Sequence, residues 1–392
     1  MFEKILKKEV QDFINANLNA DVNKLALSKN PFNDLDWSFV LNQIASKQKA
    51  KTKLPTWFAT QNIIYPTKLN IEQTSSESTA SYKANLILGE SLIDLTGGFG
   101  IDDFYFAKKF KKVVHCELNT ELSEKVDHNK TVLNQLNIQC IAGDSTEILQ
   151  RLNQNFDWIY VDPSRRNDGK GKVFQLKDCL PNVPELLDLY FKYSHQILIK
   201  NSPILDITQA ISELNFVKKV YIIALENEVK EFLIEIEKDF VGEIRCEAVN
   251  LTKNNIQKFE HTLADDATTK FTEPKTYLYE PNSAIMKSGL FNAIANTFNL
   301  SKLHIHSHLY TSEELISDFP GRIFKIENSF EFNKQNASSF LKNQKMNLTT
   351  RNFLISVEDL RKKYKINDGG TDYAFATTTL QDKKMILICQ KI

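Results

Sequence analysis

The stretch Leu92-Ile-Asp-Leu-Thr-Gly-Gly-Phe-Gly-Ile-Asp102 decides the fold of this chain. An apolar run that ends at Asp94 predicts a buried strand, and the glycines after it predict a tight turn in which the backbone comes close to a ligand. The segment from Asp102 to Lys112 has apolar residues at helical spacing. A strand, a glycine-rich turn and a helix in this order are typical of a nucleotide-type cofactor site in an α/β protein.

The glycine turn does not match the dinucleotide fingerprint, which requires G-x-G-x-x-G. Gly98 and Gly100 have the first spacing, but Asp103 stands where the third glycine would be. The carboxylate of Asp94 just before the turn would repel a pyrophosphate. A cofactor with no phosphate and a positively charged end, such as S-adenosylmethionine (SAM), fits better. The turn alone is weak evidence, because an ordinary strand-to-helix turn can have the same residues.

Three further apolar runs also end at acidic residues, namely Glu117, Asp144 and Asp162. In open α/β sheets the carboxyl ends of the strands face one crevice, so we expect these acids and Asp94 at a single ligand site. There the second acid would accept hydrogen bonds from ribose hydroxyls, and the third from an adenine amino group. One such acid is more often a helix cap or a solvated loop residue, but four in succession are hard to explain in that way.

These residues resemble the motifs of class I SAM-dependent methyltransferases, over residues 86–242. Asp94 to Gly100 matches the first motif, Glu117 the second, Asp144 the third, and Asp162 with Pro163 the fourth. The resemblance implies an α/β fold with a Rossmann-like, seven-stranded sheet. The cofactor-binding residues that it implies are Asp94, Thr96, Gly97, Gly98, Gly100, Glu117, Leu118, Asp144, Ser145 and Asp162.

The residues at the fourth motif are candidates for catalysis. Asp162 would orient or deprotonate the methyl acceptor, and Pro163 lies beside it. Arg165 and Arg166 could clamp a phosphate or a carboxylate of the substrate, or instead pair with acids of the crevice. Family members that methylate exocyclic amines usually have an aromatic residue after Asp-Pro-Pro. Here Ser164 and Arg165 follow Pro163, so the motif supplies no aromatic ring to stack on a base.

A hydroxyl-rich segment from Glu72 to Ser81 precedes the first strand. In many SAM-dependent enzymes the corresponding segment covers the methionine end of the cofactor. By this analogy Gln73, Ser76 and Lys83 are further candidates for cofactor binding. The alternative is a capped linker helix.

The composition limits the possible partners. The 49 basic and 49 acidic residues cancel, so nucleic acid would have to be bound through a local basic patch. The five cysteines have no C-x-x-C spacing and indicate a reducing compartment. Because the N-terminus also lacks the pattern of a signal peptide and no apolar run reaches about 18 residues, we expect a cytoplasmic protein without a membrane span.

The first 85 residues are expected to be mostly helical. A local basic patch runs from Lys47 to Lys53, which suits phosphate but is more simply a solvated helix end. Trp57 and Tyr65 follow, and aromatic residues beside basic ones suit single-stranded nucleic acid. Packing of these rings on the next domain is the simpler alternative.

The C-terminal part is expected to form small α+β domains. Glu280–Lys287, Asp318–Arg322 and the stretch from Arg351 to Gly370 resemble a bacterial family in which a class I methyltransferase domain precedes a ferredoxin-like and a THUMP-like domain. THUMP domains bind RNA, so the resemblance implies an RNA substrate through these C-terminal domains. The expected divisions are an N-terminal helical region (1–85), the methyltransferase domain (86–242), a linker with one strand (243–274), the ferredoxin-like domain (275–318) and the THUMP-like domain (319–392).

The segment from Leu303 to Leu309 predicts a strand with His304, His306 and His308 on one face. Three imidazoles could bind zinc, but no acid or cysteine is placed with them. We therefore expect an exposed or substrate-facing surface and no metal.

Three functions remain open at this point. The first is a SAM-dependent methyltransferase that acts on an rRNA or tRNA base. The second is a catalytically inactive RNA-binding protein with the same fold, which the presence of both Asp94 and Glu117 disfavours. The third is a nicotinamide enzyme, which the missing third glycine disfavours. The sequence therefore predicts the first.

Overall fold

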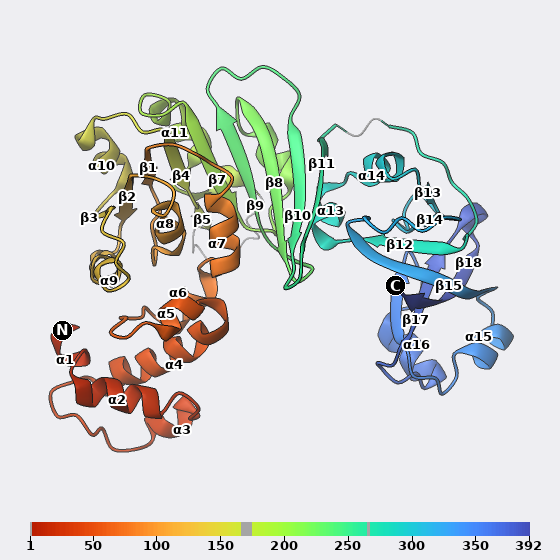
Figure 1. Ribbon diagram of the computed structural model, residues 1–392, viewed down its shortest axis with the longest axis horizontal. Coiled ribbons are helices and arrows are strands. Elements are labelled where there is room, and N and C mark those ends of the chain that lie inside the picture. Colours follow the sequence, from red (N-terminus) through yellow and green to blue (C-terminus); the bar gives the residue numbers. More distant parts are fainter. Residues whose placement is uncertain (1, 166–174, 265–266) are drawn as a thin grey trace. The chain divides into compact units, whose positions relative to one another are not determined.

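The computed structural model describes residues 2–165, 175–264 and 267–392 (Figure 1). The chain divides into two units, one of residues 1–218 with 233–241 and the other of residues 219–232 with 242–392. Within the described ranges, every helix is too short or too polar to cross a membrane.

The N-terminal region is helical, as the sequence predicts. Several of its helices are preceded by a side chain that accepts a backbone N–H of the first turn, as Asp36 does for α4 (Trp37–Lys53) and Ser76 for α7 (Glu77–Ala84). The helices are α1 (Phe2–Ile5), α2 (Lys8–Ala16), α3 (Val22–Ala26), α4 (Trp37–Lys53), α5 (Pro55–Ala59), α6 (Lys68–Gln73) and α7 (Glu77–Ala84).

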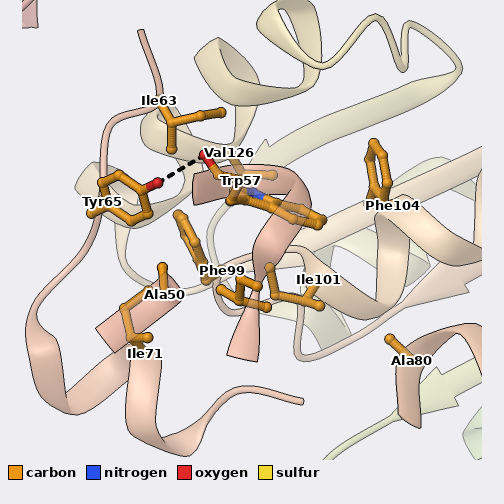
Figure 2. Close-up of a cluster of buried hydrophobic side chains, with 11 residues drawn as sticks. Ala50, Trp57, Ile63, Tyr65, Ile71, Ala80, Phe99, Ile101, Phe104 and Val126 are labelled. Atoms are coloured by element: carbon orange, nitrogen blue, oxygen red, sulfur yellow. Dashed lines mark hydrogen bonds between the residues drawn. The ribbon is translucent and has the colours of Figure 1, made fainter. Parts of the chain in front are cut away.

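The aromatic residues that follow α4 lie in a buried core. Trp57 is 2% exposed and Tyr65 is 1% exposed, and the Tyr65 hydroxyl donates a hydrogen bond to the Trp57 carbonyl at 2.8 Å (Figure 2). They share this core with Phe99 and Ile101 from the glycine-rich turn and with Phe104. The packing alternative is therefore confirmed, and this core fixes the N-terminal helices against the segment that follows the first strand.

The expected basic patch is partly used in structural contacts. Lys47 is buried and donates to Oδ1 of Asn15 at 2.8 Å. Lys49 forms an ion pair with Glu72 at 3.2 Å, and Lys53 donates to the Glu72 carbonyl at 2.6 Å. These lysines tie α4 to its neighbours.

A nine-stranded sheet has the order β11-β10-β8-β9-β7-β4-β1-β2-β3. Strands β1 to β4 and β7 pair in parallel. The central residues of β1, β2, β4 and β7 are buried, as expected for strands covered on both faces, whereas β3 at the sheet edge buries only Ile138. The strands are β1 (Ser91–Asp94), β2 (Lys112–Glu117), β3 (Ile138–Ala142), β4 (Trp158–Val161), β7 (Gln196–Asn201), β8 (Val217–Leu225), β9 (Glu228–Glu237), β10 (Arg245–Leu251) and β11 (Ile256–Thr262).

The α/β class is confirmed, but the sheet has nine strands and not the expected seven. The segment expected to be a linker with one strand (243–274) contains β10, which pairs in parallel with β8, and β11, which pairs antiparallel with β10. The hydroxyl of Thr252 accepts the N–H of Asn255 at 3.0 Å and closes the turn between them. Polar residues are common both in hairpin turns and in linkers, so the sequence pattern does not distinguish the two.

Helices and short strands connect the parallel strands. The turn between β8 and β9 consists of Glu226 and Asn227, both with positive φ (50° and 63°), as a type I′ hairpin turn requires. The connecting elements are α8 (Ile101–Phe106), α9 (Thr120–Val132), α10 (Ser145–Leu152), β5 (Ser164–Arg165), η1 (Leu176–Asp178), β6 (Cys179–Leu180), α11 (Val183–Tyr190) and α12 (Ile207–Ser212).

A seven-stranded sheet of order β13-β14-β12-β15-β18-β17-β16 forms the C-terminal part. All its pairs are antiparallel except β16 with β17. Its elements are β12 (Tyr277–Pro281), α13 (Ser283–Ser288), α14 (Phe291–Thr297), β13 (Ser301–Lys302), β14 (Tyr310–Ser312), β15 (Gly321–Glu331), α15 (Lys334–Phe340), β16 (Asn347–Arg351), α16 (Val357–Tyr364), β17 (Asp372–Thr378), η2 (Leu380–Asp382) and β18 (Lys384–Lys391).

The histidine segment is a turn between β13 and β14, so the prediction of a strand there was wrong. His304 contacts Asp382 at 3.1 Å, whereas His308 has a φ of 50° and stacks on Phe291. The rings of His304 and His306 contact each other, with centroids 5.7 Å apart, while His308 packs on Phe291, so the three side chains do not form the predicted strand face. Among the described residues, no cluster of His, Cys, Asp or Glu is suited to a metal ion.

Candidate active site

A cavity of about 630 Å³ lies at the carboxyl ends of the parallel strands. The four predicted acids, Asp94, Glu117, Asp144 and Asp162, all line it, together with residues of the glycine-rich turn. Strand β1 lies between β4 and β2, so the cavity is at the point where the strand order reverses. Open α/β sheets bind their ligands at this point.

Gly97 allows the turn to pass directly over the buried side chain of His115. A Cβ atom at Gly97 would lie 2.1 Å from Nδ1 of His115, which leaves no space for any other residue. The same nitrogen contacts Oδ2 of Asp103 at 2.6 Å, and both side chains are fully buried. The glycine-rich turn therefore packs directly on the buried pair of His115 and Asp103.

Asp94 organises the turn and connects it to the fourth motif. Its Oδ1 accepts the backbone N–H of Thr96 at 2.7 Å and the Thr96 hydroxyl at 3.1 Å. The hydroxyl oxygen of Thr96 in turn accepts the backbone N–H of Asp162 at 2.6 Å. The ends of β1 and β4 are thus joined through one threonine.

The surroundings of Asp94 favour a positively charged ligand. Burial, and then the nearby carboxylate of Asp103, raise the pKa of Asp94 well above its usual range. The pKa of His115 beside them is lowered, chiefly by burial, so its imidazole is neutral at pH 7. A ligand cation near Asp94 would stabilise the ionised carboxylate.

Glu117 and Asp144 are held by backbone N–H groups. Oε2 of Glu117 accepts from Gly98 at 2.9 Å, and its Oε1 accepts from Asn119 at 2.7 Å. Oδ1 of Asp144 caps α10 by accepting from Thr146 at 2.9 Å and from Glu147 at 3.0 Å. These contacts fix both carboxylates while each keeps acceptor capacity for hydroxyl or amino groups.

A buried ionic cluster adjoins the cavity around Asp102. The ammonium of Lys83 lies 2.9 Å from Oδ1 of Asp102, and Tyr160 and Ser75 donate to Oδ2 at 2.8 and 3.0 Å. Burial alone raises the pKa of Asp102, but the ammonium groups of Lys83 and Lys200 outweigh it and hold the pKa below its usual value. Asp102 is therefore ionised at neutral pH.

Sequence reasoning missed Lys200, which lines the cavity and forms an ion pair with Oδ2 of Asp162. The lysine is near the end of β7, and its side chain is 11% exposed. The sequence did contain a signal for this residue. The apolar run of β7 ends at a lysine, whereas the neighbouring strands end at acidic residues. The pair places a cation beside the predicted catalytic carboxylate.

The predicted site residues divide into two groups. Gln73, Thr96, Gly98, Leu118 and Ser145 line the cavity with the acids and Gly97, and Leu118 is 74% exposed there.

The other predicted residues are not among those that line the cavity. The Ser76 hydroxyl caps α7, Lys83 is buried against Asp102, and Gly100, with a φ of 72°, is the residue just before α8. Pro163 follows the lining residue Asp162. Arg165 is described only as part of β5, and Arg166 lies outside the described residues.

Cys116 also lines the cavity, but its thiol is in an environment that disfavours the reactive thiolate. Burial, together with the nearby carboxylates of Asp94 and Asp103, raises the pKa of its thiol far above the usual range. Because the thiolate is the reactive form, Cys116 is not a nucleophile at neutral pH.

Comparisons with known proteins agree with this architecture. A ferredoxin-like domain model matches residues 277–320, and a THUMP domain-like model matches residues 321–391. A solved structure described as a candidate methyltransferase from Porphyromonas gingivalis W83 is 29% identical, with a TM-score of 0.87 over 99% of this chain and 98% of that one.

An uncharacterized RNA methyltransferase of Mycoplasma mobile is 29% identical over 121 residues. The similar segment covers 30% of this chain and 33% of that relative. The chain therefore spans about a third of the relative's length.

The fold, the cavity at the strand ends and these similarities define a protein of the α/β methyltransferase class. The chain carries ferredoxin-like and THUMP-like domains at its C-terminus, so the resemblance to the methyltransferases with this domain arrangement is confirmed.

Proposed function

We propose that the protein is a SAM-dependent methyltransferase that acts on RNA, with an rRNA or tRNA base as its target. The observation that carries this proposal is the convergence of four strand-end carboxylates and a glycine-rich turn on one cavity. A pyrophosphate would meet carboxylates there, whereas a cofactor with an ammonium, hydroxyl and amino groups would meet acceptors.

The residues present fit this cofactor. Asp94 would hold the ammonium group, which accounts for a buried carboxylate whose pKa is raised without a ligand. Glu117 would accept the ribose hydroxyls, and Asp144 the adenine amino group. The exposed side chain of Leu118 would cover the adenine ring. When bound, SAM supplies a methyl group that its sulfonium already activates for displacement.

The chain's own contribution to the reaction is positioning and proton handling. The Asp162 carboxylate would accept a hydrogen bond or a proton from the methyl acceptor. Its backbone is fixed by Thr96 and its side chain by Lys200. The ion pair with Lys200 restricts the rotamer of the Asp162 side chain, so that the acceptor would be held in one orientation.

RNA as the substrate is supported by two similarities. The match to a THUMP domain-like model extends over residues 321–391, and the Mycoplasma mobile relative is named as an RNA methyltransferase. The five free cysteines support a reducing compartment and hence a cytoplasmic enzyme.

Calorimetry and methyl labelling test the proposal. The full chain should bind SAM and should not bind NAD. It should then transfer tritiated methyl groups to total RNA from a strain that lacks the gene, and mass spectrometry of the nucleosides would identify the product. Binding of SAM without any labelling of RNA would favour the inactive RNA-binding protein, and binding of NAD alone would refute both.

A further inference from the structure

A second cavity, of about 600 Å³, lies wholly within the unit of residues 219–232 and 242–392. The β8–β9 turn, the β10–β11 hairpin, the start of α13 and the segment Ser317–Ile323 form its walls. This volume is within the range of small-molecule binding sites, about 300–1,000 Å³. None of its lining residues belongs to the candidate active site.

Five amide side chains line this cavity. Asn255 lies in the β10–β11 turn, and the other four, which we name the amide row, are Asn227, Asn250, Gln257 and Asn282. The Asn250 and Asn282 side chains each donate to Oε1 of Gln257, at 3.0 and 3.3 Å, and Gln257 donates to the Gly321 carbonyl at 3.1 Å. Oδ1 of Asn227 accepts the backbone N–H of Ser283 at 2.8 Å.

The amide row is fixed in place but retains donors. Each amide nitrogen carries two hydrogens, and the contacts above use one hydrogen of Asn250, Gln257 and Asn282. The contact of Asn227 uses its oxygen. A preorganised group of N–H donors suits a ligand that is rich in acceptor atoms.

Arg322 supplies a positive charge at the same cavity. Its Nε donates to Oε2 of Glu280 at 2.6 Å, and Nη2 of Arg351 donates to Oε1 of the same carboxylate at 2.7 Å. Glu280 is 3% exposed, whereas the two arginines are 35% and 37% exposed. Two guanidinium groups thus share one buried carboxylate and leave one net positive charge.

The backbone geometry keeps Arg322 in this position. A Cβ atom at Gly321 would lie 2.1 Å from the Glu280 carbonyl, so only glycine lets β15 approach β12 here. The three C-terminal sequence stretches that carry the family resemblance, around Glu280, Arg322 and Arg351, therefore meet in one ionic cluster. Only Arg322 of the two arginines lines the cavity.

The lining contains the basic side chains of Lys258, Arg322 and Lys391 and the acidic side chains of Glu226 and Asp318, and Lys258 is paired with Glu247 at 2.8 Å. We assign the partly exposed guanidinium of Arg322 as the group that an anionic ligand would contact. An anionic ligand with many acceptor atoms is what a nucleotide offers, through its phosphate, ribose and base.

We infer that this cavity binds a nucleotide of single-stranded RNA, with the phosphate at Arg322 and acceptor atoms of the base or ribose at the amide row. The inference rests on the proposed function in so far as it takes RNA as the substrate. It adds a contact to the RNA outside the methyl-transfer site, which would hold the substrate while a different nucleotide is modified.

The affinity of the full chain for a fluorescein-labelled 15-nucleotide oligo(U) tests the inference, measured by fluorescence anisotropy at several salt concentrations. Arg322→Gln should lower the affinity about tenfold. It should also reduce the slope of log K against log salt by about 0.7, the value for one phosphate contact on a single strand. Arg351→Gln is the matched control, because it also leaves Glu280 with one arginine but lies outside the cavity lining. The control should lose clearly less affinity than Arg322→Gln, because it keeps the guanidinium that lines the cavity.

Equal losses in both variants, or no loss in either, would overturn the inference. If Arg322→Gln does not fold, Asn227→Gly replaces it, since glycine tolerates the positive φ of 63° at this turn position. This variant should lose about threefold in affinity, and unchanged affinity would overturn the inference in the same way.

The proposed function and the nucleotide cavity can be refuted independently of each other. If the wild type methylates RNA but oligo(U) binding does not depend on Arg322, only the nucleotide cavity is refuted. If the wild type binds no SAM and labels no RNA while Arg322→Gln lowers oligo(U) binding clearly more than Arg351→Gln does, only the methyltransferase proposal is refuted.

Discussion

The ammonium nitrogen of Lys83 lies 2.9 Å from Oδ1 of Asp102, and the lysine side chain is completely buried. Asp102 lines the candidate cofactor cavity, so this pair supports one wall of the site. The same carboxylate also accepts hydrogen bonds from Ser75 and Tyr160. A segment that precedes the first strand is thereby connected to α8 and β4.

Replacement of Lys83 by methionine should lower the free energy of unfolding by about 3 kcal/mol, because it leaves the Asp102 charge buried without its cation. Urea denaturation followed by circular dichroism measures the effect. In the double variant with Asp102→Asn, the loss should be smaller than the sum of the two single losses. Strictly additive losses would show that the two side chains do not stabilise each other.

Gly97→Ala should weaken SAM binding at least tenfold, because the new methyl group would lie 2.1 Å from Nδ1 of His115 and must displace the turn. Calorimetric titration with SAM measures the change. Gly289→Ala is a suitable control, since nothing lies within 4 Å of the added carbon. Alanine at the positive φ of Gly289 should lower the stability of the protein, but the SAM affinity should not change. A normal SAM affinity in Gly97→Ala would show that the turn does not position the cofactor.

Asp162→Ala and Lys200→Met should each lower the turnover number for RNA methylation about 100-fold or more. Their SAM dissociation constants should stay within about threefold of the wild type, because both residues are assigned to the acceptor side of the cavity. Single-turnover labelling with tritiated SAM measures the rate, and calorimetry measures the affinity. Full activity of Asp162→Ala would refute its catalytic role, and full activity of Lys200→Met would show that the ion pair is dispensable.

The stability of the C-terminal part should depend on pH through His308. Burial, and then the charges of Lys302, His306 and Arg351, lower the pKa of His308 to about 4. Between about pH 6.5 and 4 the unfolded state therefore binds more protons than the folded state. The contribution of His308 is present above about pH 6.5 and is lost as the pH falls towards 4.

His308→Asn tests this dependence, since asparagine tolerates the φ of 50° and does not titrate. The melting temperature of the wild type should fall more steeply than that of the variant between pH 7 and pH 4.5. A constant difference between the two proteins over this range would contradict the assignment.

The features that could be predicted from the sequence are those that depend on local pattern. The glycine-rich turn and Asp94, Glu117, Asp144 and Asp162 each follow an apolar strand, and sheet topology then brings strand ends together. Which residue of a segment faces the cavity depends on packing that sequence spacing does not show. Ser75 lines the cavity while its neighbour Ser76 caps a helix.

Long-range pairing explains the remaining differences. Strand β11 is at the edge of the sheet and pairs with β10, so the place of this hairpin in the sheet depends on the pairing of β10 with β8, which local sequence does not show. Lys200 becomes a site residue only because β7 pairs with β4 and so places it beside Asp162. The cluster of Glu280, Arg322 and Arg351 joins residues up to 71 positions apart.

The affinity of the purified full chain for SAM, determined by isothermal titration calorimetry, tests the central claim most directly. We expect the wild type to bind one SAM per chain, and Asp94→Ala and Glu117→Ala to lose this binding while keeping their cooperative thermal unfolding. A wild type that does not bind SAM, or folded variants that bind it with unchanged affinity, would contradict the account.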